Sequence, residues 1–398
     1  MTSPPTTLNL HLRCDRWETG KNPDVEALAC VVDRWLLRAG SRPLDICLAD
    51  LTEGPLDAPA LRPLLQTLQR HSPRIGTFCM ELYPNDFSLF EGHRMEFSRL
   101  VELSIASEDI EGSGPILRTF RHAPCLRRVH LSRLPLGSIT VPREQIEEFS
   151  GRGCGAEEYL DALEALPKLT TCLLQPYLID YDRDELPIIT HTHLRHLTLE
   201  ESDDEIFGFE DDLDEPRPIH ILSFLTLPAL ESLELDGTQS FDGEILRAFV
   251  ERSSPPLRKL SIAYDSGSLC ITGSLDAFLL LPCLEDLAFG SPAPKLVIQF
   301  CSLLARNPSC LPRLKSLEIT NEDESLSLLK VPSWVQEVGN ALLARGRASS
   351  SLQSVRIVLG GEFTEFRPRK SLDSLMLFAS LREKGVKVHF GTKDISAV

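Results

Sequence analysis

The chain has 398 residues, of which 42% are hydrophobic and 25% are charged, which is the balance of a globular protein and not of a disordered one. Its formal net charge of -17 disfavours a broad phosphate-binding surface, so we expect neither a nucleic-acid partner nor an anionic membrane partner. The eleven cysteines include no C-x-x-C pair, which argues against a disulfide framework or a zinc ribbon and favours reduced thiols in the cytoplasm or nucleus.

The first hundred residues predict helices that alternate with short strands. Residues 24–39 carry an apolar stripe at helical spacing that ends at Gly40, and residues 43–48 have the composition of a strand. Residues 59–70 predict a second helix, a His-Ser-Pro turn follows, and residues 75–82 predict a second strand. The opening residues MTSPPTTLNL lack the basic and apolar regions of a secretory signal, and no stretch approaches about 18 consecutive apolar residues.

From residue 97 onward the chain repeats the pattern L-x-x-L-x-L. Nine segments fit it, at 97–105, 125–131, 166–174, 193–199, 227–235, 256–262, 281–289, 311–319 and 351–357. Most of their leading leucines are 25 to 30 residues apart, and the wide gap between Leu126 and Leu169 leaves room for a degenerate unit around residues 145–150. A period of about 20 to 29 residues with this motif is the signature of leucine-rich repeats.

The segment 227–237, LPALESLELDG, shows why such a unit recurs. In an extended chain Leu233 and Leu235 point to one side, while the polar residues between them point to the other. One unit cannot bury its leucines alone, so neighbouring units must stack. The predicted fold is therefore an α/β leucine-rich-repeat solenoid, a horseshoe with a concave parallel β-sheet and convex helices, and it spans residues 1–398 as a single solenoid.

The segments between the strands have mostly helical patterns. Asp242 can cap a helix whose apolar stripe ends at residues 253–256, and the proline before each motif leucine is expected to turn the chain out of the preceding helix. Residues 371–384 predict a last helix and residues 385–390 a closing strand.

Two insertions interrupt the repeat. The first, at 200–216, contains ten acidic residues and no lysine, and we expect it to be an acidic loop. It lacks the glycine and the final glutamate that an EF-hand calcium loop needs at fixed positions, so calcium binding is disfavoured. The second insertion, at 321–333, is shorter and mixed in charge.

The residues also resemble a known family. WLLRAGSRPLDICL at 35–48, LLQTLQRHSPRIGTFCMEL at 64–82 and the segments QIEEFSG and ALPKL within 145–169 are similar to parts of fungal, mushroom-type F-box proteins with C-terminal leucine-rich repeats. The resemblance implies the substrate-recognition part of a ubiquitin-ligase receptor. No L-P-x-E-[IL]-L type F-box is found in the chain, so a ubiquitin-ligase adaptor is an expected partner only if an F-box lies upstream.

Several short motifs could suggest chemistry, but each has a structural explanation. HTHLRH at 191–196 overlaps a predicted strand and has no further ligand at metal spacing, and GRGCG at 151–155 lacks the P-loop lysine. RPRK at 367–370 is a weak nuclear-import motif. Four cysteines lie at or beside repeat leucines, where we expect them to act as small core residues: Cys47, Cys125, Cys172 and Cys283.

Alternation along the strands predicts which side chains the sheet presents to a partner. The candidate partner-binding residues are Arg128, His130, His196, Thr198, Glu200, Ser232, Glu234, Asp236, Lys259, Ser261, Asp286, Glu318 and Arg356. This set is polar and mixed in charge and contains no convergent acid–base pair, so the sequence favours a non-enzymatic, monomeric scaffold for a protein or peptide ligand, with no cofactor and no metal. The alternatives are a structural or regulatory leucine-rich-repeat scaffold independent of any ubiquitin ligase and, third, an enzyme.

Overall fold

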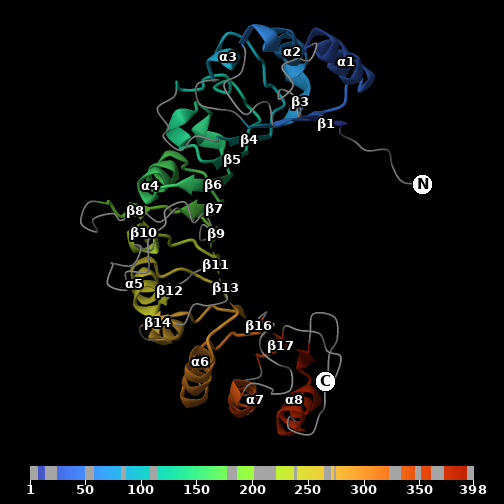
Figure 1. Ribbon diagram of the computed structural model, residues 1–398. Coiled ribbons are helices and arrows are strands. Elements are labelled where there is room, and N and C mark those ends of the chain that lie inside the picture. Colours follow the sequence, from blue (N-terminus) through green and yellow to red (C-terminus); the bar gives the residue numbers. More distant parts are fainter. Residues whose placement is uncertain are drawn as a thin grey trace, which may run out of the picture. The chain divides into compact units, whose positions relative to one another are not determined.

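The structure is a computed structural model of mixed α/β architecture (Figure 1). It describes residues 8–13, 25–49, 58–81, 87–107, 115–176, 186–200, 221–236, 240–263, 270–272, 275–307, 309–321, 333–345, 351–359 and 372–391. The chain divides into two compact units, Met1–Ile179 and Asp180–Val398. Within the described ranges, no helix has the length and apolar character needed to cross a lipid bilayer.

The first unit is built on parallel strands that follow one another in chain order, β1-β2-β3-β4-β5-β6-β7. Its strands are β1 (Leu8–Arg13), β2 (Leu44–Ala49), β3 (Ile75–Glu81), β4 (Glu102–Ala106), β5 (Arg128–Ser132), β6 (Glu148–Cys154) and β7 (Thr171–Pro176). Its helices are α1 (Val25–Arg38), α2 (Ala58–His71), α3 (Phe87–Glu91) and α4 (Ala156–Ala165). Helices α1 and α2 pack against each other.

Alternation within the strands builds the core of this unit. In β5 the exposure pattern alternates strictly, with Val129 and Leu131 buried, and the same pattern occurs in β4. The parallel register sets the buried positions opposite one another from strand to strand, in the order Phe78, Leu103, Val129, Phe149 and Cys172.

Three aromatic rings fill the space beneath these strands. The centroids of Phe97 and Phe120 are 4.9 Å apart, and Phe78 lies 5.7 Å and 6.0 Å from them. All three side chains are almost completely buried, so each contributes a large apolar area to the core.

The second unit follows the same plan, with strand order β9-β11-β13-β15-β16-β17-β18. These strands are β9 (His196–Glu200), β11 (Ser232–Asp236), β13 (Lys259–Ala263), β15 (Asp286–Gly290), β16 (Ser316–Asn321), β17 (Ser354–Leu359) and β18 (Lys387–Gly391). Two short pairs join β8 (Ile189–Thr190) to β10 (Leu225–Thr226) and β12 (Ser240–Asp242) to β14 (Cys270–Thr272). The helices are α5 (Gly243–Ser253), α6 (Pro294–Arg306), α7 (Ser333–Arg345) and α8 (Leu372–Glu383).

A proline turn precedes the strands that begin with an L-P-x-L segment. The N–H of Leu230 donates to the carbonyl of Leu227 at 3.2 Å, so Pro228 holds the second position of a four-residue turn, where its fixed φ is favourable. The same bond joins Leu284 to Leu281. The first of these turns follows the short strand β10 and the second follows a 3-10 segment, so the expectation that the proline always ends a helix was wrong.

The next two backbone groups tie each strand to its neighbour. The N–H groups of Glu231 and Ser232 both donate to the carbonyl of Arg195, at 2.8 and 2.9 Å. The pair Arg258 and Lys259 donates in the same way to Glu231. Because this pattern recurs from strand to strand, it fixes the register at the start of each strand.

Arginines at the ends of two helices satisfy carbonyl groups of the preceding turns. Arg252 in α5 donates to the carbonyls of Leu222 and Leu225, both at 2.7 Å, and burial lowers the pKa of its guanidinium group. Arg345 in α7 is 3% exposed and donates to the carbonyls of Cys310, at 2.7 Å, and Leu311. These side chains therefore connect adjacent layers through hydrogen bonds, which are buried at Arg345 and partly buried at Arg252.

Most of the predicted elements are present, with two main differences. Strand β6 lies where the sequence predicted a degenerate unit, around residues 145–150, but strand β1 was not predicted. Residues 115–147 contain 3-10 turns and no α-helix, because prolines at four places in this stretch prevent a long helix. Residues 201–216 of the expected acidic loop, most of the second insertion and the RPRK motif lie outside the described residues.

Candidate partner-binding face

The outward side chains of the second unit form rows across its strands, which we call the polar sheet face. Because the strands are parallel and in register, equivalent outward residues of neighbouring strands lie next to one another and form a row. A second row lies two residues further along each strand. The first row is His196, Ser232, Lys259, Asp286, Ser316 and Ser354, and the second is Thr198, Glu234, Ser261, Ala288, Glu318 and Arg356. Every one of these side chains is exposed or half-buried, so solvent reaches the whole face.

Ion pairs link neighbouring strands within this face. The Lys259 ammonium group contacts the carboxylate of Glu234, and Arg356 Nε lies 3.2 Å from Glu318 Oε1. Such exposed pairs contribute little to stability, about 0–1 kcal/mol each, so their main effect is to orient the side chains that the face presents.

Carboxylates gather at one side of the polar sheet face. Asp236 lies opposite Glu200 in the register of β11 and β9, and Glu234 precedes Asp236 by two residues on the same strand. Asp236 is exposed and the other two carboxylates are half-buried. This part of the face is therefore suited to a cationic segment of a ligand.

The first unit presents a similar face on β4 and β5. Arg128 donates through Nε and Nη2 to the same carboxylate oxygen of Glu102, at 3.0 and 2.8 Å, and His130 Nε2 lies 3.8 Å from the other oxygen. The structure thus brings Arg128 and His130 together on one carboxylate. The continuity of this surface with the face of the second unit remains a prediction.

All the candidate residues that the sequence predicted lie at outward strand positions. Further outward positions were not predicted: Asp45, Cys47, Thr77 and Cys79 on β2 and β3, and Lys387 and His389 on β18. The signal that could have found them is the same alternation around buried residues, which is present in β2 and β3 although neither strand carries the leucine motif.

A second line of charges lies just before the strands, next to the polar sheet face. Arg195 Nη1 is 2.9 Å from Glu231 Oε1, and Lys315 Nζ is 2.5 Å from Glu285 Oε2. The hydrogen bond from Lys315, together with the nearby Arg258, lowers the pKa of the Glu285 carboxyl group. Because these charges already pair with one another, we assign them to holding the strand register and not to ligand binding.

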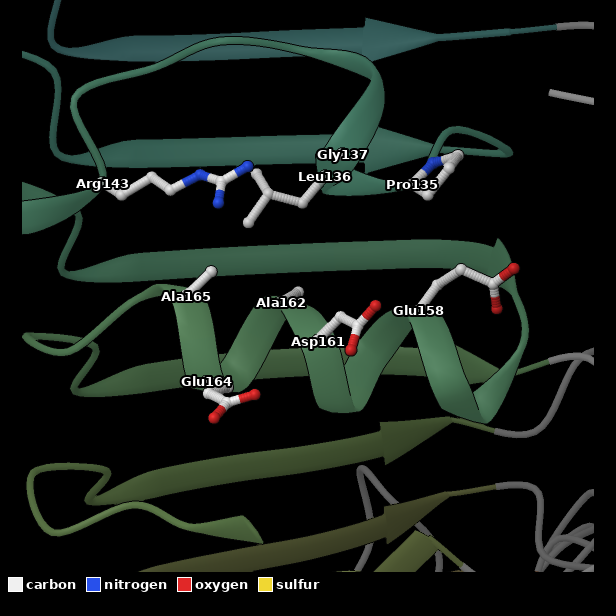
Figure 2. Close-up of a pocket in the computed structure, with 9 residues that line it drawn as sticks. All are labelled: Pro135, Leu136, Gly137, Arg143, Glu158, Asp161, Ala162, Glu164 and Ala165. Carbon is white, nitrogen blue, oxygen red and sulfur yellow. The ribbon is translucent and has the colours of Figure 1, made fainter. Parts of the chain in front are cut away.

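A separate groove lies on the helix side of the first unit (Figure 2). It has a volume of about 420 Å³, and Figure 2 shows Ala162 and Asp161 of α4 on one side and Leu136 and Arg143 on the other. Its lining is Pro135, Leu136, Gly137, Arg143, Glu158, Asp161, Ala162, Glu164 and Ala165. This lining has no histidine, cysteine or serine, so it contains no nucleophile with an adjacent base of the usual kind.

The histidine motif has a structural role. His191 is buried, and its Nδ1 accepts hydrogen bonds from the backbone N–H groups of Leu194, at 3.0 Å, and His193, at 3.4 Å. His196 is exposed on the polar sheet face, as predicted. Among the residues that the structure describes, no three histidine, cysteine or carboxylate side chains come together as a metal site.

The cysteines differ from one another in their surroundings. Cys172 is a buried core residue, as predicted, and burial raises the pKa of its thiol. The prediction for Cys125 was wrong, because this side chain is exposed, and Cys47 and Cys283 are half-exposed. Cys125 follows Pro124 in the turn before β5, where the side chain points to solvent and only the next residue, Leu126, enters the core.

Comparison with known proteins found no family model that matches the chain and no curated protein that matches it. The geometry of the polar sheet face is therefore the basis on which we assign a function.

Proposed function

We propose that the chain is a leucine-rich-repeat solenoid, with the sheet on the concave side of a horseshoe, and that it acts as a non-enzymatic scaffold for a protein or peptide ligand. The observation that carries the proposal is the register of the second unit, which aligns equivalent polar positions in two rows across β9, β11, β13, β15, β16 and β17. A surface of this kind is wide and open to solvent, which suits recognition of an extended partner by many side chains.

The charges on the polar sheet face indicate the kind of ligand. Glu200, Glu234 and Asp236 place three carboxylates close together, of which Glu234 also contacts the ammonium group of Lys259, while Arg356 lies several strands away and is paired with Glu318. A partner with a basic segment would therefore bind across β9 and β11, with its uncharged part along the serine-rich positions of the later strands. This arrangement supports a protein ligand over a small metabolite, because the described strands present the face as a broad surface open to solvent.

The resemblance to F-box proteins extends the proposal. If the chain acts as the recognition part of an F-box protein, the protein that it binds would be a substrate, and the scaffold would present this substrate to a ubiquitin ligase in the cytoplasm or nucleus. The alternative is a structural or regulatory scaffold that acts without a ligase. Co-purification distinguishes the two roles, because a cullin adaptor would be recovered with the first and not with the second.

Affinity capture with a charge-reversed face tests the binding proposal. The test variant combines Glu234→Lys and Asp236→Lys. The control combines Glu244→Lys and Glu251→Lys on α5, which makes the same change in net charge on the helix side of the same unit. Each variant also removes an ion pair, with Lys259 in the test variant and with Arg247 in the control.

We expect the wild-type chain and the α5 control to retain the same partner, and the face variant to lose it at least tenfold. The thermal unfolding midpoints of all three proteins should agree closely, since these positions are exposed or half-buried. Equal capture by the face variant, or loss of capture together with loss of folding, would contradict the assignment of the surface.

A further inference from the structure

The helix layer and the sheet of the first unit end together, at α1 and β1. Figure 1 shows α1 at the end of the row of helices, next to α2, and β1 is the outermost strand on this side of the sheet. Among the described elements, only α2 packs extensively on α1, and only β2 pairs with β1. This end of the unit therefore has both an open helix flank and an open strand edge.

The open flank of α1 is apolar. Asp33 marks the opposite flank, because its carboxylate pairs with Arg70 and His71 of α2. Val31 and Trp35 each lie two residues from Asp33, which is about 200° around a helix, so both side chains point away from α2. Each is 49% exposed, and their spacing of four residues places them next to each other as one apolar ridge.

The edge of β1 can pair with a further strand. Its outer N–H and C=O groups face no other strand in the described part of the chain, and such an edge is a template for pairing. Leucines occupy the positions of β1 that are in register with buried residues of β2: Leu8, Leu10 and Leu12. An antiparallel copy of β1 centred on Leu10 would place Leu8 opposite Leu12, so that leucine meets leucine throughout.

We propose that α1 and β1 form a two-fold interface with a second copy of this chain. A two-fold axis that runs from the sheet to the helix layer makes the two α1 helices antiparallel and, by the same operation, the two β1 strands antiparallel. Stacked units of the chain already combine two such contacts, since β1 pairs with β2 while α1 packs on α2. The dimer is independent of the protein ligand proposed for the second unit, and it replaces the monomer that the sequence favoured.

The flank of α1 is complementary to itself. If the axis passes between the two copies of Val31, Ala27 of one helix lies level with Trp35 of the other, so that a small side chain faces a large one on each side of the axis. The exposed Arg34 side chains of the two copies are then separated by about 9 Å along the helix axes. Because this is about the screening length of physiological salt, repulsion between them is small.

The size of the interface sets the expected affinity. Standard interfaces bury about 800 Å² per partner and use about 20–30 residues of each. The six residues of β1 and about half of the 14 residues of α1 would bury about half of that area. Interfaces of this size are weak, so we expect a dissociation constant of about 10 µM.

Sedimentation velocity of the full-length chain, from about 1 to about 100 µM, tests for the dimer. We expect Val31→Glu to weaken association about tenfold or more, because two carboxylates would meet at the axis. Leu37→Glu is the matched control and should associate as the wild type does. Leu37 is 62% exposed on the same helix, but it lies about 200° around the helix from Trp35 and so away from the open flank. Thermal unfolding verifies that both variants fold.

Crosslinking and hydrogen exchange test the two contacts separately. In a Cys30→Ser background, Val31→Cys should form an interchain disulfide on mild oxidation, because the axis brings the two positions together, and Leu37→Cys should not. Amide groups of residues 8–13 should gain protection from exchange at high protein concentration in the wild type and not in Val31→Glu.

Several results would overturn the proposal. The first is a wild-type chain that stays monomeric at about 100 µM. The second is association that Val31→Glu leaves unchanged, or that Leu37→Glu weakens equally, since either would place the contact elsewhere. A disulfide that forms as readily from position 37 as from position 31 would contradict the helix contact, and residues 8–13 that remain unprotected in the dimer would contradict the strand contact.

Discussion

Replacing Arg345 tests whether buried arginines connect adjacent layers of the second unit. Arg345 is the last residue of α7, and its guanidinium group donates to the carbonyls of Cys310 and Leu311, which are 0% and 1% exposed. The receiving turn is unusual, because Leu311 has φ of 47°, a conformation that costs a non-glycine residue about 1 kcal/mol or more. We infer that Arg345 helps to hold the turn in this conformation.

The magnitude follows from what each substitution removes. Arg345→Met keeps most of the side-chain volume and loses both hydrogen bonds, but Leu311 retains the N–H of Leu314 as a donor, so the main loss is at Cys310. A buried carbonyl left without its donor costs about 1–3 kcal/mol, so we expect the methionine variant to lose about 2 kcal/mol of unfolding free energy. Arg345→Ala also opens a cavity and should lose about 3 kcal/mol.

Urea unfolding measures both values. Trp334 is buried in α7, so its fluorescence reports on this region when Trp17 and Trp35 are replaced by phenylalanine. Arg306→Ala is the control, because it removes an exposed arginine at the end of α6 and should change stability by less than about 0.5 kcal/mol. A methionine variant as stable as the wild type would refute the reasoning, since desolvation of the buried charge would then offset all that its hydrogen bonds contribute.

Two further predictions concern the first unit. Gly151→Ala would place a Cβ atom 2.4 Å from Tyr159 Cε1, so we expect it to lower the free energy of unfolding by about 1–3 kcal/mol, measured by urea unfolding. Gly137→Ala is the control, because its Cβ atom would meet no atom within 4 Å, and it should have a much smaller effect. In native protein, the exposed Cys125 should react with Ellman's reagent within seconds to minutes. Cys172 should react only as fast as the chain opens, because it is buried and burial raises the pKa of its thiol. Rapid labelling of Cys172, identified by peptide mass spectrometry, would contradict its assignment to the core.

The sequence predicted the strands well because their signal is local. In LPALESLEL the leucines at alternate positions define one buried side, and the structure places Leu233 and Leu235 there with less than 2% exposure. The same local alternation identified which residues face outward. The segment at 145–150 was predicted from the wide gap between the motif leucines on either side of it, and strand β6 begins there.

The remaining features depend on contacts between distant segments. The ion pair of Glu318 with Arg356 joins residues from two strands, and nothing in either strand alone specifies its partner. Residues 115–147 contain a parallel bridge between Leu117 and Ile139 and no α-helix, and no local pattern specifies the pairing of these two residues. The position of Cys47 opposite Cys79 depends on the register of β2 and β3, which includes an irregularity after Leu44 that shifts the pairing by one residue.

Photo-crosslinking tests the central claim, that the polar sheet face binds the ligand, most directly. A photoreactive phenylalanine derivative is introduced in place of Ser261, in the middle of the face, and in a second protein in place of Glu251, on the exposed side of α5. After illumination with the captured partner, we predict a crosslinked product from position 261 and none from position 251. Crosslinking from position 251 with none from position 261 would contradict the account.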